Sequence, residues 1–414
     1  MTWDSPRFPV VECTLTEAQT AVLKCISPLA GEKVPVSEAL FYQNSTPLLA
    51  ALPKPPFDQS IRDGFALSKT PHVVNDGRAT FQVIGEIAAG CTNPGKLQPG
   101  EAVSIMTGAM VPPGCVQVVP FEVCLEEDES VSMSLENLQN KQTFIQTKGS
   151  EVKEGKVLVN AGVCLLPEHL LMLAENGCRE ITVSRKPDVA VICTGSELVG
   201  TGTMPGAGQK ISGNGVFLPG LIQAENAGCS WSVTVADEVE LIVKSINSTL
   251  ARKPDMILST GGMGPGKFDL MEQVFARLGG RVVYNRLCVR PGKFTLFGTV
   301  YDTPFFALPG PPPAVRLLFY ELVAPALGAL QGKSQVVAPL VTASLENTLS
   351  VKNTGHLSLK GAVVRLTDNR LRVRPAGRME PINSIIYLQG ERRTAEYGDN
   401  VQVRLLGGLQ GLAM

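Results

Sequence analysis

Residues 256–269 read Met-Ile-Leu-Ser-Thr-Gly-Gly-Met-Gly-Pro-Gly-Lys-Phe-Asp. The apolar run Met256–Leu258 is typical of a buried parallel strand. The glycines that follow permit a tight turn, whose backbone N–H groups can approach an anion. From Asp269 onward the apolar residues recur at helical spacing, at Leu270, Val274, Phe275 and Leu278. Open α/β sheets bind ligands beyond the carboxyl ends of their strands, so this stretch predicts an active crevice. A glycine-rich surface turn is the alternative.

A second strand and turn of the same kind lie upstream. Residues 189–193 form an uninterrupted apolar run that ends in Thr194-Gly-Ser-Glu197. Helical and strand-like runs alternate from there to Leu330, which predicts βαβ units and a mostly parallel sheet. The glycine turns at Thr194 and Thr260 then lie on one edge of the sheet. Two converging turns favour a binding site over an isolated surface turn.

Composition excludes several classes of protein. The chain has 414 residues with 37 basic and 38 acidic side chains, so no global charge favours nucleic acid or membrane. No apolar stretch of bilayer length and no export signal are evident. The ten cysteines contain no Cys-x-x-Cys pair, which indicates reduced core thiols of a cytosolic protein. Three histidines without metal-ligand spacing disfavour a zinc centre or a histidine-based mechanism.

The rest of the chain predicts a multidomain α/β plus β protein. Thr14 and Glu17 fit a capping box for a helix that runs to Ile26. Short β-runs between residues 80 and 147 predict a small inserted β-domain, and β-runs after residue 333 predict a β-barrel-like C-terminal domain. The predicted divisions are an N-terminal domain (1–50 and 152–185), an inserted β-rich domain (51–151), a ligand-binding α/β domain (186–333) and a C-terminal β-domain (334–414).

The polar residues near the predicted crevice suit a phosphate-bearing ligand and a hard cation. Oxygen ligands favour Mg²⁺, which often bridges carboxylates and phosphates, whereas guanidinium and ammonium groups favour oxyanions. Each carboxylate alone could instead be a surface charge, and Asp269 could be a helix cap. The Gly-x-Gly-x-x-Gly pattern of hydride-transfer enzymes is absent. The acidic candidates are Asp63, Glu151, Glu197, Asp237 and Asp269, and the basic ones are Arg286, Arg290 and Lys293.

Together, six motifs resemble the MoeA family of molybdopterin molybdenumtransferases, whose eukaryotic relatives include the gephyrin E domain. The resemblance spans nearly the whole chain. Its more specific pieces are Asp-Gly-Phe-Ala (63–66), Met-Thr-Gly-Ala (106–109) and Arg-Pro-Gly-Lys (290–293). The segments are 194–198 (Thr-Gly-Ser-Glu-Leu), 57–66 (Phe-Asp-Gln-Ser-Ile-Arg-Asp-Gly-Phe-Ala), 259–269, 105–109 (Ile-Met-Thr-Gly-Ala), 290–293 (Arg-Pro-Gly-Lys) and 308–312 (Leu-Pro-Gly-Pro-Pro).

The resemblance implies a fold, a reaction and partners. It implies an elongated homodimer, with the cleft between the MogA-like α/β domain of one subunit and the N-terminal region of the other. Adenylylated molybdopterin and molybdate would be the substrates, AMP would be released, and Mg²⁺ would be the cofactor. A MogA-like adenylyltransferase and molybdoenzyme maturation factors are candidate partners, in the cytoplasm, with no nucleic acid or membrane partner.

The site residues follow from the glycine turns and from the resemblance. The candidate catalytic residues are Asp63, Glu197, Asp237 and Asp269, and the last three are also the candidate metal ligands. The candidate substrate-binding residues are Thr107, Thr194, Gly195, Ser259, Thr260, Gly261, Gly262, Arg286, Arg290, Lys293, Pro309 and Pro312.

Several positions depart from the family pattern and leave alternatives open. Ser212 stands where an Asp is expected, Pro311 replaces an Asn, and Glu151 replaces an Asp. Ser196 replaces an acidic residue, and residues 59, 61 and 62 also differ. The chain is therefore interpreted as a divergent member. A catalytically weakened molybdopterin-binding or delivery protein is the second hypothesis, and an interaction scaffold is the third.

Overall fold

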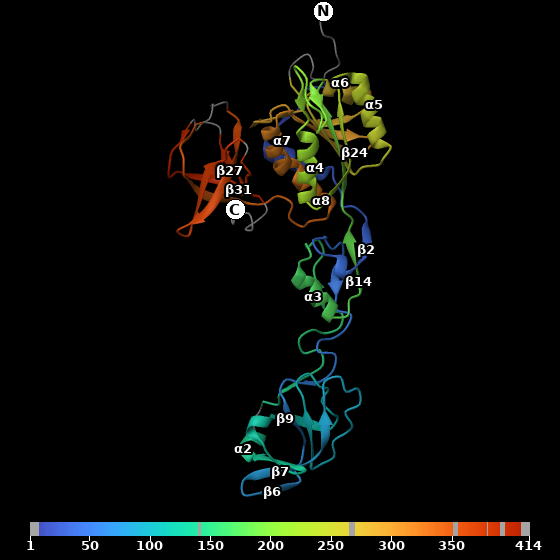
Figure 1. Cartoon of the computed structure of the whole chain (residues 1–414), viewed down its shortest axis with the longest axis vertical. Helices are drawn as coiled ribbons and strands as arrows, with labels where there is room; N and C mark the ends of the chain where they lie inside the picture. The colour runs from blue at the N-terminus through green and yellow to red at the C-terminus, as the bar shows by residue number, and fades with distance from the viewer. Residues whose placement is uncertain are drawn as a thin grey trace, which may run out of the picture.

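The computed structural model describes residues 8–139, 142–264, 270–350, 355–378, 380–389 and 394–406. The molecule is elongated (Figure 1), with an α/β domain at one end and a β-domain at the other, joined by a narrow stalk. The C-terminal β-domain lies beside the α/β domain. Asp269 lies outside the described residues, so its predicted roles as catalyst, metal ligand or helix cap stay predictions.

The α/β domain is built on a six-stranded sheet in the order β18-β15-β19-β24-β23-β20. The first four strands are parallel, and only β23 runs opposite to its neighbours β24 and β20, which confirms the mostly parallel sheet. The strands are β15 (Asp188–Thr194), β18 (Gly228–Val235), β19 (Met256–Thr260), β20 (Arg281–Tyr284), β23 (Leu296–Val300) and β24 (Thr303–Leu308).

Helices bury both faces of this sheet, which explains why its central strands are apolar throughout. Alternate residues of β15 point to opposite faces: Val189, Val191 and Cys193 enter one core, and Ala190 and Ile192 enter the other. The first core includes α1 (Leu15–Lys24), α4 (Asn214–Ala224), α7 (Pro312–Leu318) and α8 (Ala324–Leu330); the second includes α5 (Val239–Leu250) and α6 (Met271–Arg277).

Helix α1 and the amino-terminal strand tie the start of the chain to this domain. Thr14 and Glu17 form the predicted capping box, and the helix ends at Lys24, two residues earlier than expected. The preceding strand β1 (Glu12–Cys13) pairs in parallel with β21 (Arg286–Leu287). Residues far apart in the sequence therefore meet beside α6.

One helical segment corrects an expectation drawn from the sequence. Residues 312–330 run continuously through α7, a π-helical turn (Phe319–Val323) and α8, and are long and apolar enough to cross a membrane. The sequence was expected to contain no apolar stretch long enough to span a bilayer, and by length and composition this expectation was wrong. Most of this segment is buried within the protein, where it packs against the sheet, as a core helix does.

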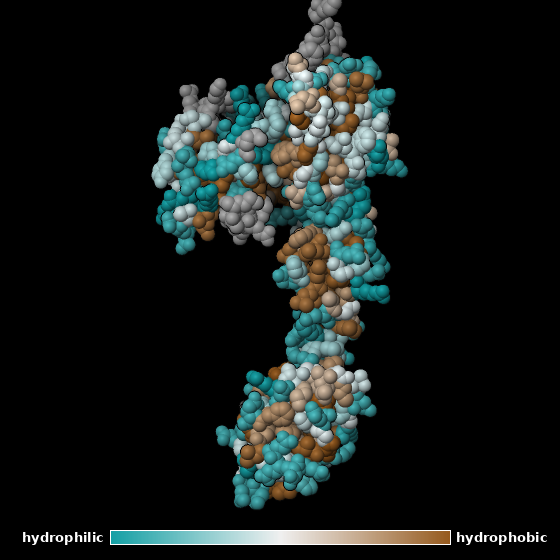
Figure 2. All heavy atoms as spheres, viewed as in Figure 1, coloured by the Kyte–Doolittle hydropathy of each residue, from teal (hydrophilic) through white to brown (hydrophobic). Residues whose placement is uncertain are grey.

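The stalk combines chain segments from both sides of the distal domain. Strand β2 (Gly31–Pro35) pairs antiparallel with β14 (Glu180–Ser184), and α3 (Pro167–Glu175) packs beside them. Large apolar side chains stay exposed here, and Figure 2 shows an apolar patch where Figure 1 draws α3. The exposed members in the stalk are Leu40, Phe41, Leu49, Leu52, Val157, Leu166 and Leu171. Strand β3 (Leu48–Leu49) forms a short antiparallel pair with β13 (Val157–Val159).

The distal domain is a β-structure, as the short β-runs predict. Its sheet has the order β10-β11-β7-β8-β5-β9, with β6 added against β7. The strands are β5 (Gly64–Ser68), β6 (Val73–Asn75), β7 (Arg78–Ile87), β8 (Glu101–Ile105), β9 (Cys115–Pro120), β10 (Leu125–Glu127) and β11 (Ser130–Ser134); α2 (Leu135–Leu138) follows, and β4 (Gln59–Ser60) pairs with β12 (Ile145–Gln146).

The C-terminal domain is a closed, barrel-like sheet. Strands β27-β28-β25-β31-β29 pair in sequence, and β29 returns to β27. The predicted hairpin joins β27 to β28, and Asp368 and Asn369 both have the positive φ that a type I′ turn requires. The strands are β25 (Leu340–Leu345), β27 (Leu357–Thr367), β28 (Arg370–Pro375), β29 (Ser384–Leu388) and β31 (Asn400–Leu405); β22 (Val289–Arg290) adds to β27, and β26 (Leu349–Ser350) pairs with β30 (Thr394–Ala395).

The cysteines differ partly from the expectation of core thiols. All ten are free, but only Cys193 is fully buried, and the other nine are half-buried. Burial raises the pKa of the Cys115 and Cys124 thiols to about 11. These two thiols are therefore protonated and unreactive near neutral pH.

Candidate functional site

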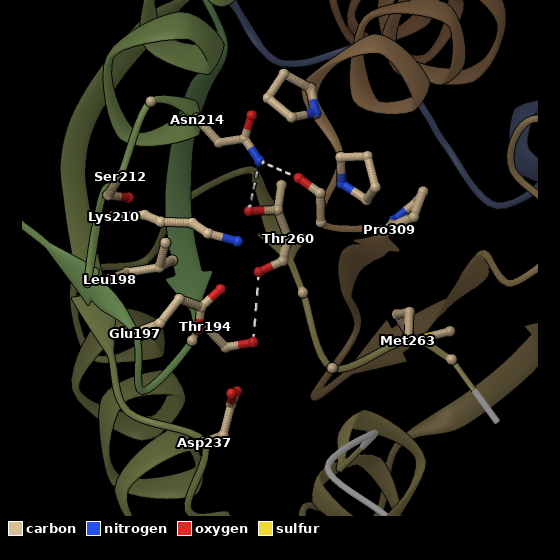
Figure 3. A pocket seen from close by; sticks show the side chains of 18 of the residues that line it. Thr194, Glu197, Leu198, Lys210, Ser212, Asn214, Asp237, Thr260, Met263 and Pro309 are labelled. Carbon is tan, nitrogen blue, oxygen red and sulfur yellow. Dashed lines mark hydrogen bonds between the residues drawn. The ribbon is translucent and has the colours of Figure 1, made fainter. Parts of the chain in front are cut away.

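A cavity of about 760 Å³ opens at the carboxyl ends of β15, β19 and β24. It lies where the two glycine turns were predicted to converge. Its walls come from residues 194–195, 197–198, 210–214, 260–264, 292–294 and 309–312, together with Asp237. Figure 3 shows side chains from both walls directed into the space between them.

The glycine turn after β19 brings two strand ends into contact. Gly261 has φ +97°, and an added Cβ would lie 2.4 Å from the Thr194 carbonyl oxygen. Its N–H donates to the Leu308 carbonyl at 3.1 Å, which links the turn to β24. The Thr194 hydroxyl donates to the Thr260 carbonyl at 3.4 Å. The floor of the cavity is therefore bare backbone, because no side chain fits there.

Asn214, the first residue of α4, ties the two walls together. Its Nδ2 donates to the Gly310 carbonyl at 2.9 Å and to the Thr260 Oγ1 at 3.3 Å. A carbonyl can only accept, so the amide orientation is determined by the Gly310 contact. The Asn214 Oδ1 is buried and meets no donor among the described residues. The amide therefore acts as a clamp across the cavity (Figure 3).

Two predicted carboxylates line the same wall. Asp237 follows β18, and its Oδ2 accepts from the Ser196 N–H at 3.2 Å while its own N–H donates to the Ser196 Oγ at 3.0 Å. Glu197 follows β15, and its carbonyl accepts from the Lys210 N–H at 2.7 Å. In Figure 3 both carboxylates lie on the side of Thr194. Ser196, a departure from the family pattern, thus holds Asp237 in place.

The donor set suits a hard cation with few protein ligands. Among the described residues no three acidic, histidine or cysteine side chains cluster as a metal site. Mg²⁺, however, commonly takes one or two carboxylates and completes its coordination with water and substrate phosphates. Glu197 and Asp237 fit that requirement.

The other predicted carboxylates lie far from this cavity within one chain. Asp63 precedes β5 in the distal domain, at the opposite end of the molecule (Figure 1). Its Oδ1 accepts from the Thr107 backbone N–H at 2.6 Å and from the Thr107 hydroxyl at 2.8 Å. These bonds, the backbone one foremost, hold the pKa of Asp63 below its ordinary value. The Glu151 carboxylate lies 3.6 Å from the Lys54 ammonium, and neither residue lines the cavity.

The three predicted basic residues do not lie together at the cavity. Lys293 lines the cavity and lies 4.0 Å from the Glu12 carboxylate. Arg286 is outside the lining: it forms a half-buried ion pair with Glu272 at 2.9 Å and stacks on the Phe294 ring at 4.9 Å. Arg290 is exposed on β22, which pairs with the C-terminal sheet. The predicted basic floor therefore reduces to Lys293 within one chain.

Most of the remaining predicted residues meet at the cavity. The exceptions are Thr107, which lies in the distal domain with Asp63, and Ser259, which is fully buried in β19 with its Oγ 3.5 Å from the Phe306 carbonyl. Ser212 and Pro311, both departures from the family pattern, also lie in the walls. The predicted residues in the lining are Thr194, Gly195, Glu197, Asp237, Thr260, Gly261, Gly262, Lys293, Pro309 and Pro312.

The sequence reasoning missed Lys210 and the bridging role of Asn214. Both lie in Lys210-Ile-Ser-Gly-Asn214, a segment recognised only for its departure from the family pattern. Strand β17 (Lys210–Ile211) pairs in parallel with β16 (Leu198–Val199), immediately after Glu197. A two-residue strand has no readable periodicity, so only the position of Lys210 four residues before a helix start could have drawn attention to it.

Family models and similar proteins match most of the chain. Residues 13–177 match the MoeA N-terminal region (domain I and II), and residues 190–329 match a probable molybdopterin binding domain. Similar relatives named molybdopterin molybdenumtransferase occur in Staphylococcus aureus, 28% identical over 401 residues and covering 94% of each chain, and in Staphylococcus epidermidis, 26% identical over 404 residues and covering 95% of each.

Solved structures show the same fold. A crystal structure of the molybdopterin biosynthesis MoeA protein from Pyrococcus horikoshii has a TM-score of 0.83 at 25% identity, covering 97% of this chain and 100% of that one. A second from the same organism has a TM-score of 0.76 at 23% identity, covering 96% and 100%.

Proposed function

This chain belongs to the MoeA family, and we propose that it is a transferase of molybdenum cofactor biosynthesis that inserts molybdate into adenylylated molybdopterin and releases AMP. The cavity at the strand ends carries the proposal. It is large enough for a nucleotide-sized ligand, and it combines a backbone floor, two carboxylates and lysine side chains in one space.

The residues of the cavity have separable roles in this proposal. The N–H groups of residues 262–264 would bind anionic oxygens, because a glycine-lined turn lets the backbone approach closely. Lys293 would neutralise part of their charge. The Asn214 amide would keep the two walls at the right separation, since it is bonded to Thr260 and Gly310.

We also propose Mg²⁺ as the cofactor. Glu197 and Asp237 would hold it, and it would supply charge neutralisation at the substrate phosphates when bound. Asp237 is already oriented by its reciprocal bonds with Ser196. Asp237 thus needs little rearrangement to accept a cation.

The direct test is AMP release. Purified protein is mixed with adenylylated molybdopterin, molybdate and Mg²⁺, and AMP is measured by chromatography. We expect AMP only when all components are present. A folded protein that binds the substrate without turnover would instead support the delivery hypothesis, which the transferase names of its relatives do not favour.

A homodimer would bring the distal carboxylate to the cavity. Within one chain Asp63 and Thr107 belong to the distal domain and Asp237 to the α/β domain, and these domains lie at opposite ends of the molecule (Figure 1). The stalk between them exposes large apolar side chains, of which Leu171 is 61% and Leu52 50% exposed (Figure 2). An apolar patch on a narrow stalk suits contact with a second copy.

Complementation tests this shared site. Asp63→Asn and Asp237→Asn chains with different affinity tags are co-expressed, and the mixed dimer is isolated through both tags. One of its two sites would then be intact, so we expect about half of the wild-type turnover from two chains that are inactive separately. A mixed dimer as inactive as its parents would refute the shared site.

The cellular setting follows the same proposal. We place the reaction in the cytoplasm, where its ten free thiols would stay reduced. A MogA-like adenylyltransferase would supply the adenylylated substrate, and maturation factors of molybdoenzymes would receive the product. Cell fractionation and pull-down of the tagged chain test these two assignments.

A further inference from the structure

Lys210 is held at the cavity by its backbone. Its N–H donates to the Glu197 carbonyl at 2.7 Å, and the Ser212 N–H donates to the Val199 carbonyl at 2.9 Å. The parallel pairing of Lys210 with Leu198 lies between these two bonds. The position of the Cα is therefore determined on both sides, and only the side chain is free to move.

The side chain enters the cavity. Lys210 belongs to the lining, and in Figure 3 its ammonium points away from β17 into the space beside Thr260. In Figure 3 Glu197 lies on one side of the Lys210 side chain, Asn214 on the other, and Thr260 beyond its ammonium. A ligand on the glycine floor would face this ammonium.

The charge of Lys210 is available to a ligand. Its ammonium makes no hydrogen bond or ion pair with any described residue, whereas the Lys293 ammonium lies 4.0 Å from Glu12 and that of Lys333 lies 3.8 Å from Glu225. Ser212, two residues on, is a neutral side chain, and its Oγ is buried and accepts from the Thr234 hydroxyl at 3.1 Å.

We infer that Lys210 is a substrate-binding residue that contacts a tetrahedral oxyanion on the glycine floor; this rests on the proposed function. A lysine offers three donors and a compact positive charge and has no acceptor, which matches a phosphate or molybdate oxygen. The two candidate oxyanions share this chemistry. They differ in whether the group belongs to the nucleotide or to free molybdate.

The experiment measures anion binding and does not need turnover. Affinities for AMP, inorganic pyrophosphate and molybdate are determined by calorimetry for the wild type, Lys210→Gln and Lys210→Arg. Lys156→Gln is the matched control, because Lys156 is an exposed lysine in the stalk. Thermal unfolding of each variant confirms that the fold is retained, as expected for an exposed side chain.

We expect Lys210→Gln to lower the affinity for at least one of these anions about tenfold, as loss of a charge-assisted hydrogen bond does. Lys210→Arg should retain most of the affinity, and Lys156→Gln all of it. Weakening confined to AMP and pyrophosphate assigns Lys210 to the nucleotide phosphates, and weakening confined to molybdate assigns it to molybdate. Unchanged affinity for all three anions would overturn the inference.

The outcome is distinguishable from failure of the proposed function. If the wild type releases no AMP but Lys210→Gln still weakens anion binding, the inference holds and the transferase proposal fails. If the wild type turns over and Lys210→Gln changes neither anion affinity nor the KM for the substrate, the inference alone fails.

Discussion

The two ends of the molecule each carry a candidate catalytic carboxylate, but in different settings. In the α/β domain Asp237 lines a cavity, because the carboxyl ends of parallel strands meet at one edge. In the distal domain Asp63 is held by Thr107 on an exposed loop. A parallel sheet builds a crevice within one chain, whereas an exposed loop on a mostly antiparallel sheet needs a second surface to make one.

Glycine substitutions at the two ends should have the largest effects. A Cβ at Gly261 would lie 2.4 Å from the Thr194 carbonyl oxygen, and one at Gly64 would lie 2.1 Å from the Val119 carbonyl oxygen. We expect Gly261→Ala and Gly64→Ala each to lower the free energy of unfolding by about 1–3 kcal/mol and turnover by about 100-fold.

Urea denaturation and AMP release check these two variants. Gly220→Ala is the control, because this α4 position has open space around it and helical alanine is stabilising by about 0.5–1 kcal/mol. If Gly64→Ala leaves turnover intact while Gly261→Ala abolishes it, the distal end takes no part in the site.

Removing the charge of each carboxylate distinguishes the role of Asp237 in turnover from that of Asp63. Asp237→Asn keeps the oxygen that accepts from the Ser196 N–H, so we expect an intact fold and about 100-fold lower turnover. Asp63→Asn should also lower turnover, but only if a second subunit brings Asp63 to the cavity. Equal turnover of Asp63→Asn and the wild type, in a confirmed dimer, would restrict the chemistry to the α/β end.

Substitution of Arg286 tests whether this residue stabilises the fold beside the cavity or contacts the substrate. Its ion pair with Glu272 and its stacking on Phe294 predict that Arg286→Met costs about 1.5–3 kcal/mol of stability. The KM should change less than about threefold, whereas Lys293→Met should raise it more, since Lys293 lines the cavity. Steady-state kinetics and denaturation of both variants make this comparison. A large KM effect of Arg286→Met with unchanged stability would restore its predicted role in anion binding.

The smallest effect concerns the titration of Asp63. The backbone N–H of Thr107 is the main cause of the lowered pKa, and the hydroxyl adds to it. A lowered pKa contributes stability above the ordinary pKa of an aspartate, and that contribution is lost as the pH falls through the folded value. We expect Thr107→Val to move the Asp63 pKa upward but to leave it below its ordinary value, as NMR titration of the carboxyl carbon would show. A pKa that does not move would mean that the hydroxyl bond contributes nothing.

The local elements could be predicted from the sequence because their signals are local. The Thr14 capping box, the Asp368-Asn369 turn and the apolar strand β15 all formed as expected. Much of the cavity was also predictable, since parallel strands place both glycine turns on one edge. Lys210 was not, because a two-residue strand leaves no pattern in the sequence.

The sequence by itself determined the parallel sheet, its glycine floor and the acidic residues at its rim, because hydrophobic periodicity and the absence of Cβ atoms act over a few residues. Only the tertiary structure decided which charges meet. It paired Arg286 with Glu272, placed Arg290 on a strand that pairs with the C-terminal sheet, and directed Lys210 into the cavity. Side-chain partners are chosen by packing between segments far apart in the chain, and no spacing along the sequence encodes that choice.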